Sequence, residues 1–466
     1  MPVAKKAQTI GQLRRSRYKV LPVREEMRKN LIAKIKAEEI VFPGIIGFED
    51  TVIPQLENAI LAGQDIILLG ERGQAKSRLI RSMVNLLDEF VPKIAGCEIN
   101  DNPYDPICRP CRDLVADKGS DAPLEWIPRD ERYAEKLATP DISIADLIGE
   151  IDPIKVAEGH YLSDELAIHY GLVPRTNRGI FCINELPDLA ERIQVGLFNL
   201  MEERDVQIKG YRIRLPLDVH VVSTANPEDY TNRGRIVTPL KDRYGSQIHT
   251  HYPMTTHEEI TIMDQERARF PDEDSIIVPD YMKQILAEVT FQARQSSEIN
   301  QRSGVSVRVS IANYETLLGN ALRRSIVHGD EWTCPRTSDL PFIAASFSGK
   351  IELETFEEGR ENRVTDDLTR KAVSRVFGDY FDLADLEDLV MAFDMGKLVE
   401  TGSEKPCSDY PALLKEIPEL ACAVEKLTKD DRPEIISSAI EFVLEGLHLN
   451  RRLNCERAPG GYIYRR

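Results

Sequence analysis

The sequence has no long apolar run, no cysteine framework and no excess of positive charge. Its apolar runs, such as residues 66–69, are far shorter than the roughly 18 residues that a membrane span requires. Eight cysteines scattered over 466 residues do not resemble the disulfide framework of a small secreted protein. The first residues also lack the apolar segment of a secretory signal. We therefore expect a soluble protein of the reducing cytoplasm that does not contact a membrane.

The balance of charge argues against one broad class of function. The chain has 60 Lys and Arg against 77 Asp and Glu, a formal net charge of −17. A protein that coats nucleic acid through its overall charge needs the opposite sign. Residues 1–36 are the exception, with eleven Lys and Arg against Glu25 and Glu26. We treat residues 1–41 as a basic N-terminal arm, either a solvated surface segment or a docking arm for an acidic neighbour.

From Phe42 onward, short apolar runs alternate with helical patterns, which is typical of an α/β domain with a mostly parallel sheet. We expect buried strands at 65–69, 179–183 and 219–224, and helices at 51–62 and 77–90. Beyond Pro253 strand signals thin out, and helical spacing recurs at 257–270, 281–295, 310–328 and 433–449. The expected domains are therefore a nucleotide-binding core at 42–253, a helical lid at 254–330 and a C-terminal helical region at 331–466.

The strand at 65–69 leads into a phosphate-binding pattern. Its residues are Gly70, Glu71, Arg72, Gly73, Gln74, Ala75, Lys76 and Ser77, followed by Arg78, and they match G-x-x-x-x-G-K-[ST] except that Ala75 replaces the second glycine. In such a turn, backbone N–H groups face phosphate, Lys76 reaches the β- and γ-phosphates, and Ser77 holds Mg²⁺. The methyl group of Ala75 costs about 1 kcal/mol if its φ is positive. The alternative is an ordinary strand-to-helix turn.

Polar residues also end two other predicted strands. Glu185 follows the strand at 179–183 and is the candidate carboxylate that polarises the attacking water. Asn184 precedes it where an aspartate is expected, and keeps an oxygen for a Mg²⁺-bound water but loses the charge. The substitution Asn184→Asp should thus lower the Mg²⁺ requirement about tenfold. Asn226 ends the third strand and is a candidate to bond the γ-phosphate or the water.

This order of motifs resembles the AAA+ ATPases, specifically the magnesium-chelatase subunit I and MoxR-like branch, over about residues 42–328. Ile45, Ile46 and Gly47 look like that family's adenine-contacting segment. The long interval before Asn184, with its Asp146-Leu147-Ile148-Gly149 stretch, is also similar to the chelatase subunit. The resemblance implies ATP and Mg²⁺ as cofactors. It also implies a partner with a von Willebrand factor A domain.

The resemblance implies further site residues. Arg243 looks like an arginine finger that acts on the neighbouring subunit's nucleotide, which implies a homo-oligomeric ring, expected to be a hexamer. Arg308 falls where a second sensor arginine is expected, with Arg302 as its competitor. Residues 206–214 alternate about a Lys-Gly turn and predict a hairpin. In the family this hairpin lines a pore, which makes Lys209, Tyr211 and Arg212 candidate partner contacts; an ordinary surface hairpin is the alternative.

A separate cysteine cluster interrupts the interval between the two nucleotide motifs. Cys108 and Cys111 form a C-x-x-C pair, and Cys97 precedes them. Three thiolates are candidate zinc ligands, with Asp101 or Asp105 left to supply the fourth. Three reduced thiols in a helical insertion are the alternative.

The most favoured function is an ATP-hydrolysing ring motor that remodels a partner protein or loads a metal into it. Two alternatives remain open. One is a nucleotide-switched scaffold with little turnover, which the substitutions at Ala75 and Asn184 would produce. The other is a nucleic-acid-associated AAA+ protein, either a helicase or a transcription activator.

Overall fold

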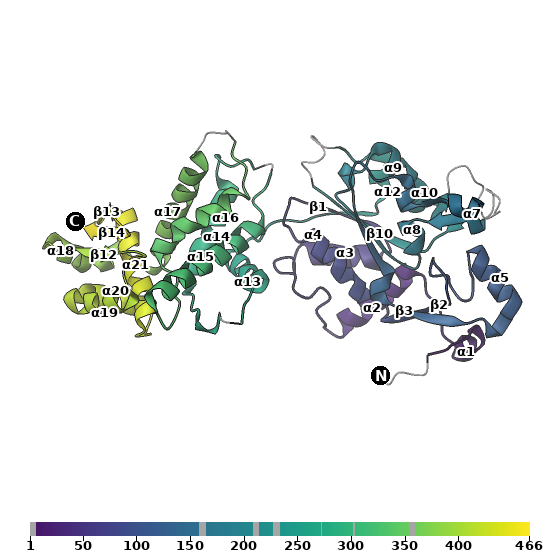
Figure 1. Cartoon of the computed structure of the whole chain (residues 1–466), viewed down its shortest axis with the longest axis horizontal. Coiled ribbons are helices and arrows are strands. Elements are labelled where there is room, and N and C mark those ends of the chain that lie inside the picture. Colours follow the sequence, from purple (N-terminus) through teal and green to yellow (C-terminus); the bar gives the residue numbers. More distant parts are fainter. Residues whose placement is uncertain are drawn as a thin grey trace. The chain divides into compact units, whose positions relative to one another are not determined.

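The computed structural model describes residues 6–157, 165–207, 214–226, 234–271, 273–301, 303–354 and 359–466. The chain divides into two compact units, Met1–His251 and Tyr252–Arg466 (Figure 1). The first unit contains the nucleotide motifs, and the second contains the helices expected beyond Pro253. This boundary lies close to the one expected at 253.

A five-stranded parallel sheet forms the centre of the first unit. Its strand order is β11-β1-β10-β7-β4, and every neighbouring pair is parallel. The strands are β1 (Ile66–Leu69), β4 (Tyr133–Leu137), β7 (Gly179–Asn184), β10 (Val219–Ala225) and β11 (Ser246–His249). The three strands expected from the sequence are β1, β7 and β10, which lie side by side.

Helices cover both faces of this sheet, which explains why its central strands are apolar throughout. Ile66 and Leu68 of β1 pack into one core with α2 (Val23–Lys36), α3 (Val52–Leu61) and α4 (Lys76–Ser82). Ile67 and Leu69 belong to the other core, on the opposite face of the sheet. That second core is covered by α6 (Ile144–Leu147), α8 (Leu172–Arg175), α9 (Glu191–Gly196), α10 (Phe198–Glu202) and α12 (Thr238–Arg243).

The basic segment at the N-terminal side is part of the first unit from α1 (Ile10–Arg15) onward. Ile10 and Leu13 are buried, as are Val23, Met27 and Leu31 of α2. Several of its charges also have partners within the unit. Glu26 forms a fully buried ion pair with Arg132 at 2.6 Å. Nearer the surface, Arg24 pairs with Asp65 at 2.5 Å, and Lys29 pairs with Asp88 at 2.9 Å. Residues 10–15 and 23–36 are therefore helices that pack onto the first unit.

The helix expected at 77–90 is shorter than predicted. It consists of α4 followed by a single 3₁₀ turn, Met83–Leu86, and the chain then enters β2 (Phe90–Ile94). Side chains of α2 take up the backbone groups at this point, because Asn30 donates to the Leu86 carbonyl at 2.9 Å and Glu26 accepts from the Asp88 N–H at 2.5 Å. A tertiary contact therefore ends the helix.

The remaining elements of the first unit are short. The strand β2 pairs antiparallel with β3 (Leu124–Pro128), and α5 (Arg109–Lys118) lies between them in the chain. The predicted hairpin is present as β8 (Asp205–Gln207) paired antiparallel with β9 (Arg214–Pro216). Its tip, with Lys209, Tyr211 and Arg212, lies outside the described residues, as does Arg302. The others are α7 (Pro153–Ala157), β5 (Gly149–Ile151) and β6 (Ile168–Tyr170).

The second unit is mainly helical and has one continuous core from Met263 to Tyr464. Its helices are α13 (Thr256–Glu266), α14 (Asp280–Gln295), α15 (Val307–His328), α16 (Ala344–Ser348), α17 (Arg360–Tyr380), α18 (Glu387–Asp394), α19 (Tyr410–Glu416), α20 (Pro418–Leu427) and α21 (Pro433–Leu449). Residues of the expected lid and of the expected C-terminal region share this core. The predicted fold class, a parallel αβα core followed by helical regions, is confirmed.

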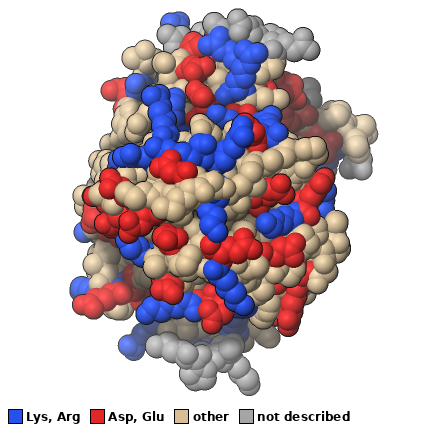
Figure 2. Space-filling view, turned by 90° about the vertical axis from the view of Figure 1, so that its left-hand side faces the viewer, with Lys and Arg blue, Asp and Glu red and all other residues tan. Residues whose placement is uncertain are grey.

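One element of the second unit was not expected. A small antiparallel sheet combines β12 (Val399–Thr401), β13 (Asn454–Ala458) and β14 (Gly461–Arg465). Figure 2 shows the face of this unit on which both Lys/Arg and Asp/Glu side chains are spread. In the described part of the chain, no helix is long and apolar enough to cross a membrane.

Candidate nucleotide-binding site

The phosphate-binding pattern lies where the sequence places it, between the end of β1 and the start of α4. Lys76 is the first residue of α4 and is 7% exposed. Its ammonium group donates to the carbonyl oxygens of Gly70 and Glu71, the latter at 2.6 Å. The loop therefore curls around this ammonium group, and the partly exposed Ser77 follows in the first turn of the helix.

Ala75, the departure from the glycine pattern, adopts the backbone conformation that a glycine would favour. Its φ is 52° and its ψ is 13°, in the left-handed region, at the N-cap of α4. An L-residue pays about 1–2 kcal/mol for this conformation. The loop thus keeps the shape of a phosphate-binding turn despite the methyl group.

The start of the loop is tightly enclosed by the end of a neighbouring strand. A Cβ atom on Gly70 would lie 1.9 Å from the Thr250 hydroxyl and 2.2 Å from the Gln74 amide oxygen. Thr250 follows β11, and its hydroxyl donates to Gln74 at 2.7 Å. Gly70 is therefore required sterically, and Thr250 helps to hold the loop. Sequence reasoning did not identify Thr250.

The parallel sheet brings the three predicted strand ends to the same edge. Leu69 pairs with Ala225, and the Gly70 N–H donates to the Ala225 carbonyl at 3.1 Å. On the other side of β10, Ser223 pairs with Ile183, one residue before Asn184. Neighbouring strands lie about 4.8 Å apart, so the end of β7 is about 10 Å from the end of β1. That span is appropriate for a bound phosphate with an attacking water.

Glu185 is held in an unusual conformation at this edge. Its φ of 55° and ψ of 49° are left-handed, which is uncommon for a residue with a side chain. Its N–H donates to the hydroxyl of Thr224 at 3.0 Å, which fastens the end of β7 to β10. Such strain, of the order of 1–3 kcal/mol, is typical of functional sites. Asn226, 1% exposed, continues β10 at the same edge.

Asn184 is oriented by hydrogen bonds to the neighbouring strands. Its amide nitrogen donates to Glu135 of β4, and its amide oxygen accepts from the Thr224 hydroxyl at 3.4 Å. Glu135 is in turn paired with Arg81 of α4, at 2.8 and 2.9 Å. These Arg81 hydrogen bonds hold the pKa of Glu135 below its usual value. The site thus contains a carboxylate one strand away from where the pattern predicted one.

The segment predicted to contact adenine lies against the same end of the sheet. Ile45 is buried in the core beside α3, and Gly47 has a φ of 80°. Just beyond it, the Thr51 hydroxyl bonds the His251 ring at 2.7 Å, and the Phe48 ring packs edge-on against that ring. His251 directly follows Thr250. Residues 45–51 and the phosphate loop are therefore both anchored at the end of β11.

Arg243 lies near the amino ends of the strands, opposite the end at which the phosphate loop lies. It ends α12, three residues before β11 begins, and the neighbouring Ser246 N–H bonds the Asp65 carbonyl just ahead of β1. Its guanidinium group pairs with Glu202 at 3.0 Å and stacks on Phe198 at 4.7 Å. The structure therefore does not bring Arg243 to the phosphate loop of its own chain.

Arg308 belongs to the second unit. It is exposed in the first turn of α15, where its N–H donates to the Ser306 hydroxyl at 3.1 Å. Its predicted role toward the nucleotide stays a prediction.

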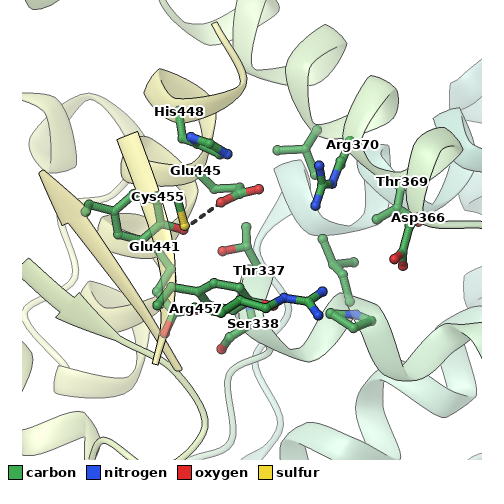
Figure 3. A pocket seen from close by; sticks show the side chains of 15 residues that line it. Thr337, Ser338, Asp366, Thr369, Arg370, Glu441, Glu445, His448, Cys455 and Arg457 are labelled. Atoms are coloured by element: carbon green, nitrogen blue, oxygen red, sulfur yellow. Dashed lines mark hydrogen bonds between the residues drawn. The ribbon is translucent and has the colours of Figure 1, made fainter. Parts of the chain in front are cut away.

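The second unit has a pocket of about 130 Å³ between α17, α21 and the β13–β14 hairpin (Figure 3). Arg370 and Arg457 project toward it from different elements. Its carboxylates have structural partners, because Glu441 accepts from the Ser338 N–H at 3.0 Å and Glu445 accepts from the Tyr464 hydroxyl at 2.6 Å. We therefore assign this pocket no chemistry.

Comparison with curated proteins finds magnesium-chelatase subunits among the relatives of this chain. No family model matches the chain. Magnesium-chelatase subunit ChlI of Nostoc is 29% identical over 232 residues, 46% of this chain and 56% of that protein. The chloroplastic ChlI-2 of Arabidopsis thaliana is 26% identical over 299 residues, 61% of this chain and 67% of that protein. The match to the Nostoc subunit thus spans little more than half of that protein.

Among solved structures, a chain from the BchI and BchD complex of magnesium chelatase aligns with 70% of this chain and 99% of its own length. Its TM-score is 0.36 at 20% identity, too low to add to the assignment. The sequence relatives and the observed sheet carry the conclusion. The chain is similar to the magnesium-chelatase subunit I branch of the AAA+ ATPases, as its motifs predict.

Proposed function

We propose that this chain is an ATP-hydrolysing subunit of an AAA+ ring motor that remodels a partner protein or loads a metal into it. The observation that carries the proposal is the convergence of Lys76, Glu185 and Asn226 on one edge of the sheet. A buried lysine in a curled loop and a strained carboxylate about two strands away are the groups that phosphoryl transfer to water requires.

Each residue has a defined task in this proposal. Lys76 exchanges the carbonyls of its own loop for phosphate oxygens and neutralises their charge. Glu185 accepts a hydrogen bond from the attacking water and polarises it. Asn226 orients the γ-phosphate or the water from the neighbouring strand. Residues 45–47 contact the adenine.

The residues at this edge fit a magnesium ion. The Ser77 hydroxyl, the Asn184 amide oxygen and the Glu185 carboxylate are hard oxygen donors, which Mg²⁺ prefers. The Asn184 oxygen is already turned toward β10 by its contact with Thr224. Bound there, Mg²⁺ would offset the negative charge of the phosphates.

Arg243 supports assembly into a ring. It lies away from the phosphate loop of its own chain, and in this proposal it exchanges its pair with Glu202 for the γ-phosphate of a neighbouring copy, reached in trans. Arg308 is proposed as a second sensor of nucleotide. A hexamer is the ring size that the family resemblance favours. A protein with a von Willebrand factor A domain is the proposed partner. Its identity would decide whether the motor remodels this partner or loads a metal into it.

The test measures ATP binding and phosphate release by the purified full chain. Lys76→Ala should abolish binding, because the loop loses its buried cation. Glu185→Gln should bind ATP and lose turnover, because the amide holds the water without polarising it. Glu191→Gln, at an exposed glutamate on nearby α9, is the matched control and should hydrolyse ATP normally.

Two outcomes would overturn the assignment: undiminished ATP affinity in Lys76→Ala, or wild-type turnover in Glu185→Gln. A chain that binds ATP but does not hydrolyse it, alone or with candidate von Willebrand factor A domain proteins, would instead be a nucleotide-switched scaffold.

A further inference from the structure

The loop between β2 and α5 brings together a set of residues that the nucleotide site does not use. Cys97, Asp101, Cys108 and Cys111 each offer one ligand atom, and these four atoms all lie within 4.8 Å of one another. All four residues are buried, with exposures of 0–5%. The sequence left Asp101 and Asp105 open as partners of the three thiols, and the structure selects Asp101.

The spacing fits a single metal ion. A tetrahedral zinc ion with Zn–S bonds of about 2.3 Å requires its ligand atoms to be about 3.8 Å apart. The four ligand atoms all lie within 4.8 Å of one another, which is compatible with that arrangement. An iron–sulfur cluster would need its thiolates spread around several irons, so the compact spacing favours one ion.

Asp101 supplies a second, independent observation. This side chain is 0% exposed, and its Oδ1 atom has no hydrogen-bond partner among the described residues. Its other oxygen accepts from the Cys108 N–H at 3.0 Å, which fixes the carboxylate beside the thiols. A buried carboxylate oxygen without a partner is unfavourable, and a bound cation would satisfy it.

The surroundings favour negatively charged ligands. Cys108 is the N-cap of α5 and Cys111 lies in its first turn, so both sit at the positive end of a ten-residue helix. The Lys93 ammonium donates to the Cys97 carbonyl at 3.0 Å, and the buried Arg178 donates to the Pro92 carbonyl at 2.8 Å and the Asp101 carbonyl at 3.4 Å. These cations offset the charge of three thiolates and a carboxylate.

We propose that Cys97, Asp101, Cys108 and Cys111 bind one structural zinc ion. Four protein ligands complete a tetrahedral shell and leave no open position, so the ion would stabilise rather than catalyse. It would connect the irregular loop that follows β2 to the start of α5. This proposal does not depend on ATP hydrolysis.

The test is the zinc content of the full chain, expressed with zinc and purified without chelators. We expect about one equivalent for the wild type, and less than about a tenth for Asp101→Ala and Cys108→Ser. Asp105→Ala removes another acid of the same loop, and Cys334→Ser removes a buried thiol of the second unit; both should keep the full equivalent. Removing zinc from the wild type should lower its melting temperature, and returning zinc should restore it.

A second variant covers the case in which Asp101→Ala or Cys108→Ser fails to fold. Asp101→Cys offers four thiolates and should retain zinc. With cobalt in place of zinc, the wild type and Asp101→Cys should both show thiolate-to-metal absorption, and the tetrahedral bands should shift between the two. A wild type with less than about a tenth of an equivalent after incubation with zinc, or loss of zinc from Asp105→Ala equal to that from Asp101→Ala, would overturn the proposal.

Discussion

Replacing Asn184 by aspartate tests the nucleotide site most directly, because sequence and structure predict different results. The pattern alone predicts a gain in Mg²⁺ affinity, since a second carboxylate would attract the ion. The structure adds an opposing effect, a loss of stability of the folded protein. Asn184 donates its amide N–H to Glu135, and an aspartate has no hydrogen to donate there.

The size of the opposing contribution follows from the local geometry. Losing a hydrogen bond to a charged group costs about 1.5–3 kcal/mol. Two carboxylates about 4 Å apart repel each other by ~4 kcal/mol at an effective dielectric constant of 20. Arg81 already pairs with Glu135 and offsets part of this repulsion. We therefore expect Asn184→Asp to destabilise the nucleotide-free protein by ~2–4 kcal/mol at pH 8.

This deficit should depend on pH. The neighbouring charge raises the pKa of one carboxyl group of the pair above its unfolded value. The folded variant then holds a proton that the unfolded chain has released, so the deficit is smallest below about pH 4 and grows as the pH rises through the raised pKa. Melting temperatures of variant and wild type compared at pH 5 and pH 8 measure this change.

A double-mutant cycle isolates the contact. In Asn184→Asp with Glu135→Gln, the glutamine can donate the hydrogen that the aspartate lacks, so most of the lost stability should return. The coupling between the two changes should be ~2–3 kcal/mol. The tenfold lower Mg²⁺ requirement should then be visible in the double variant and weak or absent in the single one. Additive effects on stability, or an equal gain in Mg²⁺ affinity with and without Glu135, would refute the reasoning.

The other predictions concern single positions. Ala75→Gly should stabilise the fold by up to ~1 kcal/mol, because relief of the left-handed strain slightly exceeds the entropy that glycine loses; Ala33→Gly, on the exposed face of α2, should instead cost ~1 kcal/mol in the same unfolding assay. His220 is buried, and burial lowers its pKa from 6.5 to about 4. Above pH 6.5 this ring does not reduce the stability of the folded chain. As the pH drops to 4 the unfolded chain gains a proton that the buried ring does not, and the free energy of unfolding falls by ~3 kcal/mol. The stability of His220→Leu should therefore improve relative to wild type over that interval. Arg243→Ala should change stability by less than ~1 kcal/mol, since its pair with Glu202 is on the surface, yet it should poison mixed assemblies; loss of ATPase activity in simple proportion to the mutant fraction would argue against action in trans.

Local patterns predicted the parts of this molecule that depend on neighbours in sequence. The buried runs of β1, β7 and β10 are continuous and apolar because helices cover both faces of the sheet. Polar residues at their ends meet because parallel strands share an edge. The Pro459-Gly460 turn between β13 and β14 also has a local signal, a Pro-Gly pair with a φ of 74° at the glycine, which the helical spacing nearby obscured.

Contacts between distant segments could not be predicted in this way. Nothing near Glu135 in the sequence indicates that it meets Arg81, 54 residues earlier, or Asn184, 49 residues later. Thr250 contacts Gln74 across 176 residues. Periodicity and motif spacing contain no information about such pairs. They become visible only when the order of the strands is known.

The two departures from the glycine and acidic patterns are therefore different in kind. Ala75 is tolerated at a cost, because the loop still imposes the left-handed backbone that glycine would adopt freely. Asn184 is accommodated by its neighbours, because Glu135 requires a hydrogen-bond donor and Arg81 keeps Glu135 charged. If Asn184 were merely a lost aspartate, Glu135 would have no reason to face it with an ionised carboxylate. The negative charge expected at position 184 is instead present on the adjacent strand, where Arg81 of α4 holds it in place.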